Sequence, residues 1–166
     1  MSLIVRFMAR LAWPLCLVYG LYVVLHGHLT PGGGFQGGAV MATGAALMLV
    51  SRGWSREEAE SHERRMHWLE TLGLAGFWLL ALGGLLHGAA FFHNWPAGTG
   101  GLFGGAVAPG PNAGRLWTGG TIPLMNLAVG LEVLGGLSVI LHGFGRAMGE
   151  SERDAGGEKR EAGDVE

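Results

Sequence analysis

Four long apolar segments run along the chain, and charged residues gather between and beyond them. The segments cover approximately residues 11–25, 31–50, 68–92 and 121–142. A helix needs about 20 predominantly apolar residues to cross the hydrocarbon core of a bilayer, and the segments approach or exceed that length. Outside residues 1–10, 52–70 and the tail after residue 145, the charged residues are Arg115 and Glu132. This pattern predicts an all-α integral membrane protein with four transmembrane helices.

The arginines and lysines predict how these helices are oriented. They gather in the first ten residues, in the loop that follows the second segment and in the tail, whereas Arg115 stands alone on the opposite side. Lys and Arg accumulate in cytoplasmic loops. With four spans, all three clusters lie on one side, so we expect both termini to be cytoplasmic.

The composition argues against several classes of function. Of the 166 residues only 14% are charged, compared with about 25% in soluble domains. The formal net charge of −2 does not indicate a nucleic-acid partner, which would require a basic surface. Cys16 is the single cysteine, so the chain has neither an internal disulfide nor a thiolate metal cluster. We expect no metal site, no cofactor and no catalytic site.

A glycine-rich stretch, residues 30–38, separates the first two apolar segments. Thr30 before Pro31 is typical of a helix start, with the threonine as N-cap and the proline at the first helical position. Glycine in a helix interior costs about 0.8–1.0 kcal/mol relative to alanine, so these glycines indicate a close approach of another backbone. Glycines four residues apart recur in the third segment, and such pairs let membrane helices pack closely. We predict helix packing or subunit contacts at Pro31, Gly32, Gly33, Gly34, Phe35, Gly37, Gly38, Gly84 and Gly88.

The same glycines also match a nucleotide-binding pattern. Gly32, Gly34 and Gly37 have the spacing of the dinucleotide fingerprint. That fingerprint works only after a strand and at the start of a helix within a βαβ unit. Here it follows an apolar membrane segment, so we do not favour nucleotide binding.

Three polar residues inside the apolar segments are candidates for a function in the membrane. Glu132 lies well within the fourth segment, where a charge costs about 2.5–3.5 kcal/mol and usually faces a polar cavity or a partner. It is either a relay for protons or ions, or a structural hydrogen-bonding carboxyl. His87, in the outer third of the third segment, is the second ion-path candidate. Asn126 is expected to hydrogen-bond to another helix or to serve as an interfacial amide.

The histidines leave a further alternative open. His26, His28, His87 and His93 lie at or near the outer ends of the first and third segments. Two histidines at one depth on facing helices can hold a haem through its axial positions. The alternative function is therefore a four-helix haem-b electron carrier that uses His26 with His87 or His93.

Two longer motifs resemble a known family. Residues 27–38, Gly-His-Leu-Thr-Pro-Gly-Gly-Gly-Phe-Gln-Gly-Gly, resemble the signature of the MnhB/MrpB subunit of Mrp-type multisubunit sodium/proton antiporters. Residues 121–133, Thr-Ile-Pro-Leu-Met-Asn-Leu-Ala-Val-Gly-Leu-Glu-Val, resemble the start of that family's last helix. The resemblance implies a non-catalytic accessory subunit of a prokaryotic plasma membrane. It would pack beside antiporter-like subunits and help to form the path for sodium ions or protons.

The resemblance has departures that bear on the parent complex. Asn126 stands where many antiporter subunits have an aspartate, and Glu132 lies further into the helix. This form resembles members associated with group 4 membrane-bound hydrogenases, whose membrane arm contains the same subunit type. The alternative parent is therefore such a hydrogenase or a related redox-driven ion pump.

The chain divides into two parts. Residues 1–145 are expected to form the MnhB-like four-helix membrane domain, with residues 94–120 as a glycine-rich external loop. Residues 146–166 are acidic and almost free of large apolar side chains. We expect them to be a disordered cytoplasmic tail.

Overall fold

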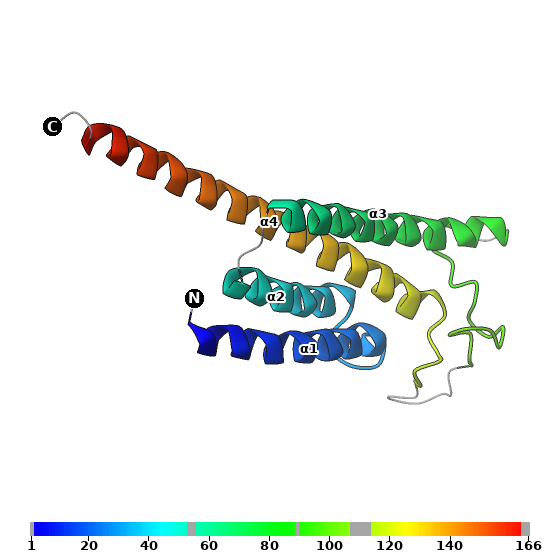
Figure 1. Cartoon of the computed structure of the whole chain (residues 1–166). Helices are drawn as coiled ribbons and strands as arrows, with labels where there is room; N and C mark the ends of the chain where they lie inside the picture. Colours follow the sequence, from blue (N-terminus) through cyan, green and yellow to red (C-terminus); the bar gives the residue numbers. More distant parts are fainter. Residues whose placement is uncertain (1, 53–55, 89, 107–113, 164–166) are drawn as a thin grey trace.

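A computed structural model describes residues 2–52, 56–88, 90–106 and 114–163, and four helices dominate this part of the chain (Figure 1). They are α1 (Leu3–His26), α2 (Gly34–Arg52), α3 (Arg56–Leu86) and α4 (Thr121–Gly163). Each contains a segment long and apolar enough to cross a membrane. The prediction of an all-α protein with four transmembrane helices is confirmed.

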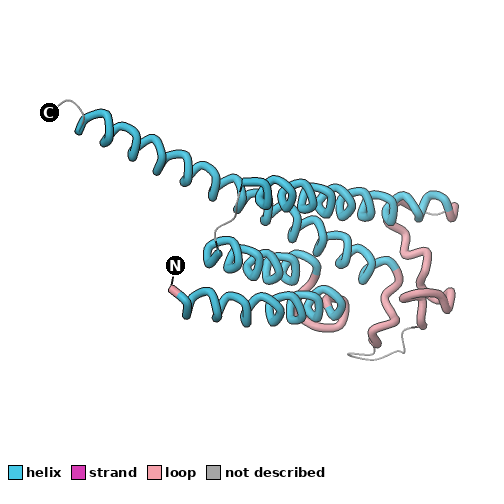
Figure 2. The backbone as a smooth tube through the Cα atoms, viewed as in Figure 1, coloured by secondary structure: helices cyan, strands magenta, loops and turns pink. Residues whose placement is uncertain are grey.

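The helices pack in an order that differs from their order in the chain. α1 packs on α2, α2 packs on α4, and α4 packs on α3, with a smaller contact between α1 and α4. Within the described residues, α3 makes its helix contacts with α4 alone. Both chain ends lie toward one end of the bundle, and the loops gather at the other end (Figure 2). Which end faces the cytoplasm stays a prediction.

The start of α2 corrects one prediction from the sequence. Thr30 does not cap α2, because its N–H and its hydroxyl both donate to the His26 carbonyl at the end of α1, at 2.9 and 3.1 Å. Pro31 precedes the helix, which begins at Gly34. Gly32 and Gly33 have φ values of 148° and 157°, a conformation that residues with a Cβ rarely adopt. The threonine therefore closes the preceding helix, and the glycines make the turn.

The end of α3 corrects a second prediction. The helix ends at Leu86 instead of continuing to Phe92, and Gly88 follows it with a φ of 71°. The chain then folds back, so that the Phe92 N–H donates to the Ala81 carbonyl at 3.1 Å. Gly84 faces this returning segment, since a Cβ built on it would lie 2.8 Å from the His93 nitrogen. The predicted helical pair of Gly84 and Gly88 is therefore wrong: Gly84 makes room for the chain's own turn.

The loop before α4 holds the start of that helix. The Asn94 side-chain oxygen accepts from the Thr121 N–H at 2.8 Å, and its amide donates to the Gly119 carbonyl at 3.1 Å. A single bridge joins Gly105 to Thr118, whereas residues 107–113 lie outside the described residues. This loop thus caps α4 by way of one asparagine.

The fourth helix extends further than expected. α4 continues without a break to Gly163, through most of the segment that we expected to be disordered. This segment has no proline and several Glu, Lys and Arg residues, which are good helix formers. The division of the chain at residue 145 stays a prediction.

Candidate functional site

The glycine-rich stretch has two faces in the structure. Gly33, Gly34, Gly37 and Gly38 are buried, whereas Phe35 is 61% exposed. Gly34 and Gly38 lie on the same face because residues four positions apart on a helix point in the same direction. Phe35 and Gln36, between the buried glycines, point away from this face and are exposed. One face of the first turns of α2 is therefore backbone alone.

This bare face touches two helices of the same chain. A Cβ built on Gly34 would overlap the Asn126 carbonyl of α4, and one built on Gly38 would lie 2.8 Å from the Gly130 carbonyl. A Cβ built on Gly37 would lie 2.5 Å from the Gly20 carbonyl of α1. Real Cβ atoms essentially never approach other atoms within 3.0 Å. The glycines thus let α2 lie directly against α1 and α4, while contact with another subunit stays a prediction for exposed Pro31 and Phe35.

The two sequence motifs meet at Asn126. A Cβ built on Gly27 would lie 2.8 Å from the Asn126 side-chain nitrogen, and one on Gly33 would lie 3.5 Å from its side-chain oxygen. The amide therefore covers the turn between α1 and α2. This contact joins residues 27–38 to residues 121–133, the two motifs that carry the resemblance.

Glu132 lies on the opposite side of α4, where that helix meets α3. It is half-buried and lines a pocket of about 350 Å³. The other lining residues are apolar or aromatic: Leu74, Phe77, Trp78, Phe91, Phe92 and Val129. Among these lining residues, Glu132 is the one with an ionisable side chain. Glu132 is therefore the single carboxyl among apolar and aromatic side chains in this pocket.

His87 does not share this pocket. It is exposed, its Nδ1 lies 2.9 Å from the Gly83 carbonyl, and its ring stacks on Trp95 with centroids 4.7 Å apart. The pocket around Glu132 is completed by Phe91 and Phe92 instead. The structure therefore does not bring the two ion-path candidates together.

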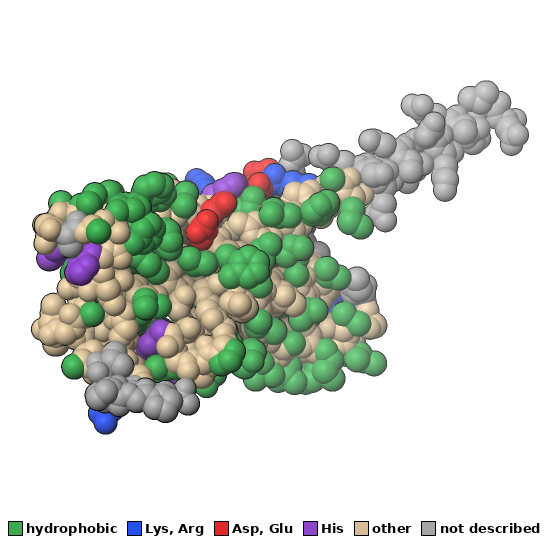
Figure 3. Space-filling model, turned by 180° about the vertical axis from the view of Figure 1, so that it is seen from behind, with side chains coloured by type: hydrophobic (Ala, Val, Ile, Leu, Met, Phe, Trp, Pro, Cys, Tyr) green, Lys and Arg blue, Asp and Glu red, His purple; other side chains and the backbone are tan. Residues whose placement is uncertain are grey.

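The end of the α3–α4 pair away from the loops is polar. Arg146 of α4 pairs with Glu63 of α3 at 2.7 Å, and His62 stacks on His142 with ring centroids 4.9 Å apart. A second pocket, of about 490 Å³, opens here between Glu60, Glu63, Arg64, His67, Trp68, Thr71 and Arg146. Acidic, basic and histidine side chains gather along one edge of an otherwise largely apolar face (Figure 3). We call this region the Arg146 end.

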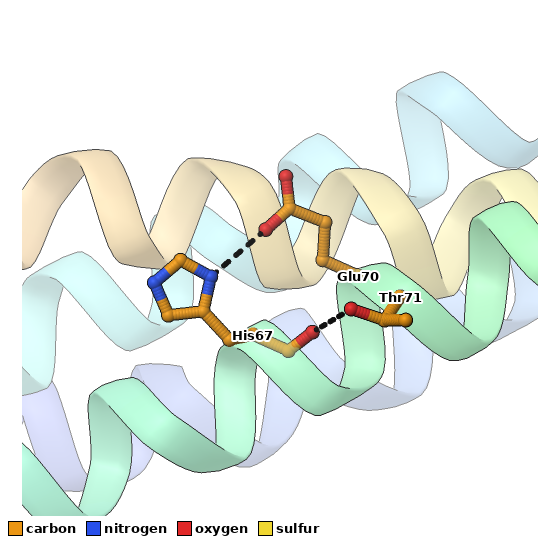
Figure 4. Close-up of polar contacts among 3 residues, drawn as sticks. All are labelled: His67, Glu70 and Thr71. Carbon is orange, nitrogen blue, oxygen red and sulfur yellow. Dashed lines mark hydrogen bonds and ion pairs between the residues drawn. The ribbon is translucent and has the colours of Figure 1, made fainter.

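Glu70 is a residue that the sequence analysis did not single out. The third apolar segment was expected to begin near residue 68, but α3 begins at Arg56, so Glu70 lies well inside the helix. Its carboxylate lies 3.3 Å from His67 Nδ1, and the Thr71 hydroxyl donates to the His67 carbonyl (Figure 4). A Cβ built on Gly136 of α4 would lie 3.4 Å from the Glu70 carboxylate. The sequence signal was a carboxylate just inside an apolar segment.

The arrangement of histidines does not favour the haem alternative. His26 Nδ1 lies 3.0 Å from the Tyr22 carbonyl, and its ring stacks on Tyr22. In the described part of the chain, α1 makes no contact with α3. His26 ends α1, whereas His87 and His93 follow the end of α3, so these histidines belong to helices that do not pack on each other. The residues described also contain no group of three or more His, Cys, Asp or Glu side chains that could hold a metal ion.

Comparison with known proteins gives two matches. Residues 4–139 match the family model MnhB, described as a domain related to the MnhB subunit of Na+/H+ antiporter. The chain is also similar to a protein of Methanocaldococcus jannaschii named "Uncharacterized protein MJ1307", with 37% identity over 135 residues. This match covers 81% of the chain and 49% of that relative, so the chain spans about half of the relative's length.

Proposed function

Because the chain belongs to the MnhB family, we propose that it is a non-catalytic subunit of a multisubunit Na+/H+ antiporter-type complex. In this complex it packs beside antiporter-like subunits and supplies part of the path for protons or sodium ions. The observation that carries the proposal is the position of Glu132 in the middle of a helix that is long and apolar enough to cross a membrane, in a pocket with apolar and aromatic walls.

The cost of such a carboxyl argues for a function. Glu132 lies within the candidate span Thr121–Met148, opposite Gly73, which is the middle residue of the candidate span Glu60–Leu86. An ionised side chain at the bilayer centre costs about 2.5–3.5 kcal/mol even on lenient scales, and such residues usually mark ion or proton pathways. Trp78, Phe91 and Phe92 of this pocket are exposed, so a neighbouring subunit would cover it in the complex and exclude lipid from the carboxyl.

The distribution of charge supports the orientation. Arg6 and Arg10 lie in the first turns of α1. The start of α1 and the end of α4 lie at the same end of the bundle as Arg146 (Figure 1). By the positive-inside rule this end faces the cytoplasm. The glycine-rich loops then lie on the outer side of a prokaryotic plasma membrane.

The test is Glu132→Gln in the assembled complex. Glutamine keeps the size and hydrogen-bonding capacity of the side chain but cannot exchange a proton or carry a charge. We expect at least a tenfold loss of cation-dependent proton movement in membrane vesicles, while the subunit still co-purifies with its complex. Glu132→Asp is the matched control and should retain part of the activity. Unchanged transport by Glu132→Gln would leave this subunit with a packing role only.

The parent complex has a second candidate, favoured by one departure from the antiporter pattern. Asn126, in place of the aspartate of many antiporter subunits, covers Gly27 and Gly33 as a neutral amide. Together with Glu132 this resembles the form in group 4 membrane-bound hydrogenases. Purification from the native membrane distinguishes the two, since nickel–iron hydrogenase subunits would accompany the chain only in the second case.

A further inference from the structure

We propose that Glu70 is a second ion-path carboxyl, which exchanges protons between the Arg146 end and Glu132 along the contact between α3 and α4. This inference rests on the proposed function of Glu132. It is carried by three observations: the register of the two helices, the directions of the two side chains, and the polar pocket beside Glu70.

The register places the two glutamates next to each other by a reciprocal arrangement. A Cβ built on Gly73 of α3 would lie 2.6 Å from the Glu132 nitrogen, and one built on Gly135 of α4 would lie 2.6 Å from the Glu70 nitrogen. Each glutamate thus lies against a glycine of the facing helix, three residues from that helix's own glutamate. At 1.5 Å per residue, the two positions are separated by only about 5 Å along the helix axes.

The two side chains point toward opposite ends of the bundle. Side chains in a helix lean toward its N-terminus, and α3 and α4 run in opposite directions (Figure 1). Glu70 accordingly reaches toward His67 and the Arg146 end, and Glu132 reaches into the pocket formed with Phe77 and Val129. The two carboxylates therefore face two half-paths, which meet where the backbone of each glutamate lies against a glycine of the facing helix.

The cytoplasmic half-path is polar as far as Glu70. His67, whose Nδ1 lies 3.3 Å from the Glu70 carboxylate, lines the pocket at the Arg146 end together with Thr71 and Arg146. The Glu70 side chain is 41% exposed, so it is reachable from this side. A proton taken up by the ionised Glu70 carboxylate neutralises it, and its transfer to ionised Glu132 restores Glu70 to the charged form. Glu132 then passes the proton to the neighbouring subunit that covers the pocket and becomes ionised again, so each cycle leaves both carboxylates unchanged and moves one proton.

The competing explanation is a structural ion pair. A Glu–His pair three residues apart on a helix stabilises the helix only slightly, so its loss would lower stability a little without stopping transport. Under that explanation His67→Gln and Glu70→Gln have the same small effect. Under ours, Glu70→Gln has by far the larger effect on transport.

The experiment compares Glu70→Gln, Glu70→Asp and Glu132→Gln in the assembled complex, with proton movement in vesicles and co-purification of subunits as readouts. We expect Glu70→Gln to reduce transport at least tenfold with normal assembly, and Glu70→Asp to restore a substantial part of it. Normal transport by Glu70→Gln with loss in Glu132→Gln would overturn this inference alone. Normal transport by both glutamine variants would overturn the proposed function as well. Loss by Glu70→Gln without recovery in Glu70→Asp would assign Glu70 a role in packing and also refute the inference.

Discussion

The close packing of α1 against α2 can be tested by adding a single methyl group. Gly37 lies against α1 so closely that a Cβ on it would be 2.5 Å from both the Gly20 carbonyl oxygen and Val24 Cγ2. Ordinary contact begins at 3.4 Å, so the two helices would have to separate by about 0.9 Å around Gly37→Ala. A gap of 0.5–1 Å forfeits about a quarter to a half of the dispersion energy of the atoms that face it.

The magnitude follows from two opposing terms. Overpacking of this kind costs about 1–3 kcal/mol, whereas replacing a helical glycine by alanine gains up to about 1 kcal/mol in helix propensity. We therefore expect Gly37→Ala to destabilise the protein by about 1–2 kcal/mol. For a chain of this size that is a decrease of about 2–8 °C in the unfolding temperature.

The chain supplies a matched control for this change. Gly143 also lies in a helix, but a Cβ built on it meets nothing within 4 Å among the described atoms. Gly143→Ala should therefore leave the stability unchanged or raise it by up to about 1 kcal/mol. The assay is thermal unfolding of the purified protein in detergent, followed by the loss of the monodisperse peak in size-exclusion chromatography. Equal unfolding temperatures for the two variants would refute the close contact between α1 and α2.

Two further predictions concern the ends of the helices. Asn94→Ala removes the cap of α4 at Thr121 and Gly119 and should lower the stability by about 1 kcal/mol, measured by the same thermal assay. Asn94→Asp keeps the acceptor for the Thr121 N–H and should lose less stability. Equal losses of stability in the two variants would contradict the capping role. Phe35→Ala should leave the unfolding temperature of the isolated chain almost unchanged, because the ring is 61% exposed, but should weaken co-purification with the other subunits by more than about 1 kcal/mol if the ring anchors an interface. Normal assembly of Phe35→Ala would exclude this face of α2 as a subunit contact.

The sequence by itself determined the class of the protein and the number of its spans. Apolar segments long enough to cross a membrane, with the charges confined between and beyond them, form transmembrane helices, because each backbone N–H and C=O in lipid must be hydrogen-bonded within its own helix. The sequence also singled out Glu132, because an acidic residue between two long apolar runs is visible without coordinates. The family resemblance required only the two contiguous motifs of residues 27–38 and 121–133.

The tertiary structure decided what the glycines touch and where the helices begin and end. A bare helix face is visible in the sequence, but its partner is not, and Gly34, Gly37 and Gly38 proved to face α1 and α4 of the same chain. The ends of helices depend on competition among hydrogen-bond acceptors. Thr30 donates to the His26 carbonyl in the last turn of α1 instead of capping α2. The chain reverses after α3, so that the segment around His93 lies against Gly84.

The tertiary structure alone also set Glu70 beside Glu132. The two residues are far apart in the chain and come together because α3 and α4 run antiparallel, with a glycine on each helix admitting the backbone of the other's glutamate. Local patterns reveal which residues are unusual in a membrane. Which of them act together depends on register between helices, and register is fixed by contacts between residues distant in sequence.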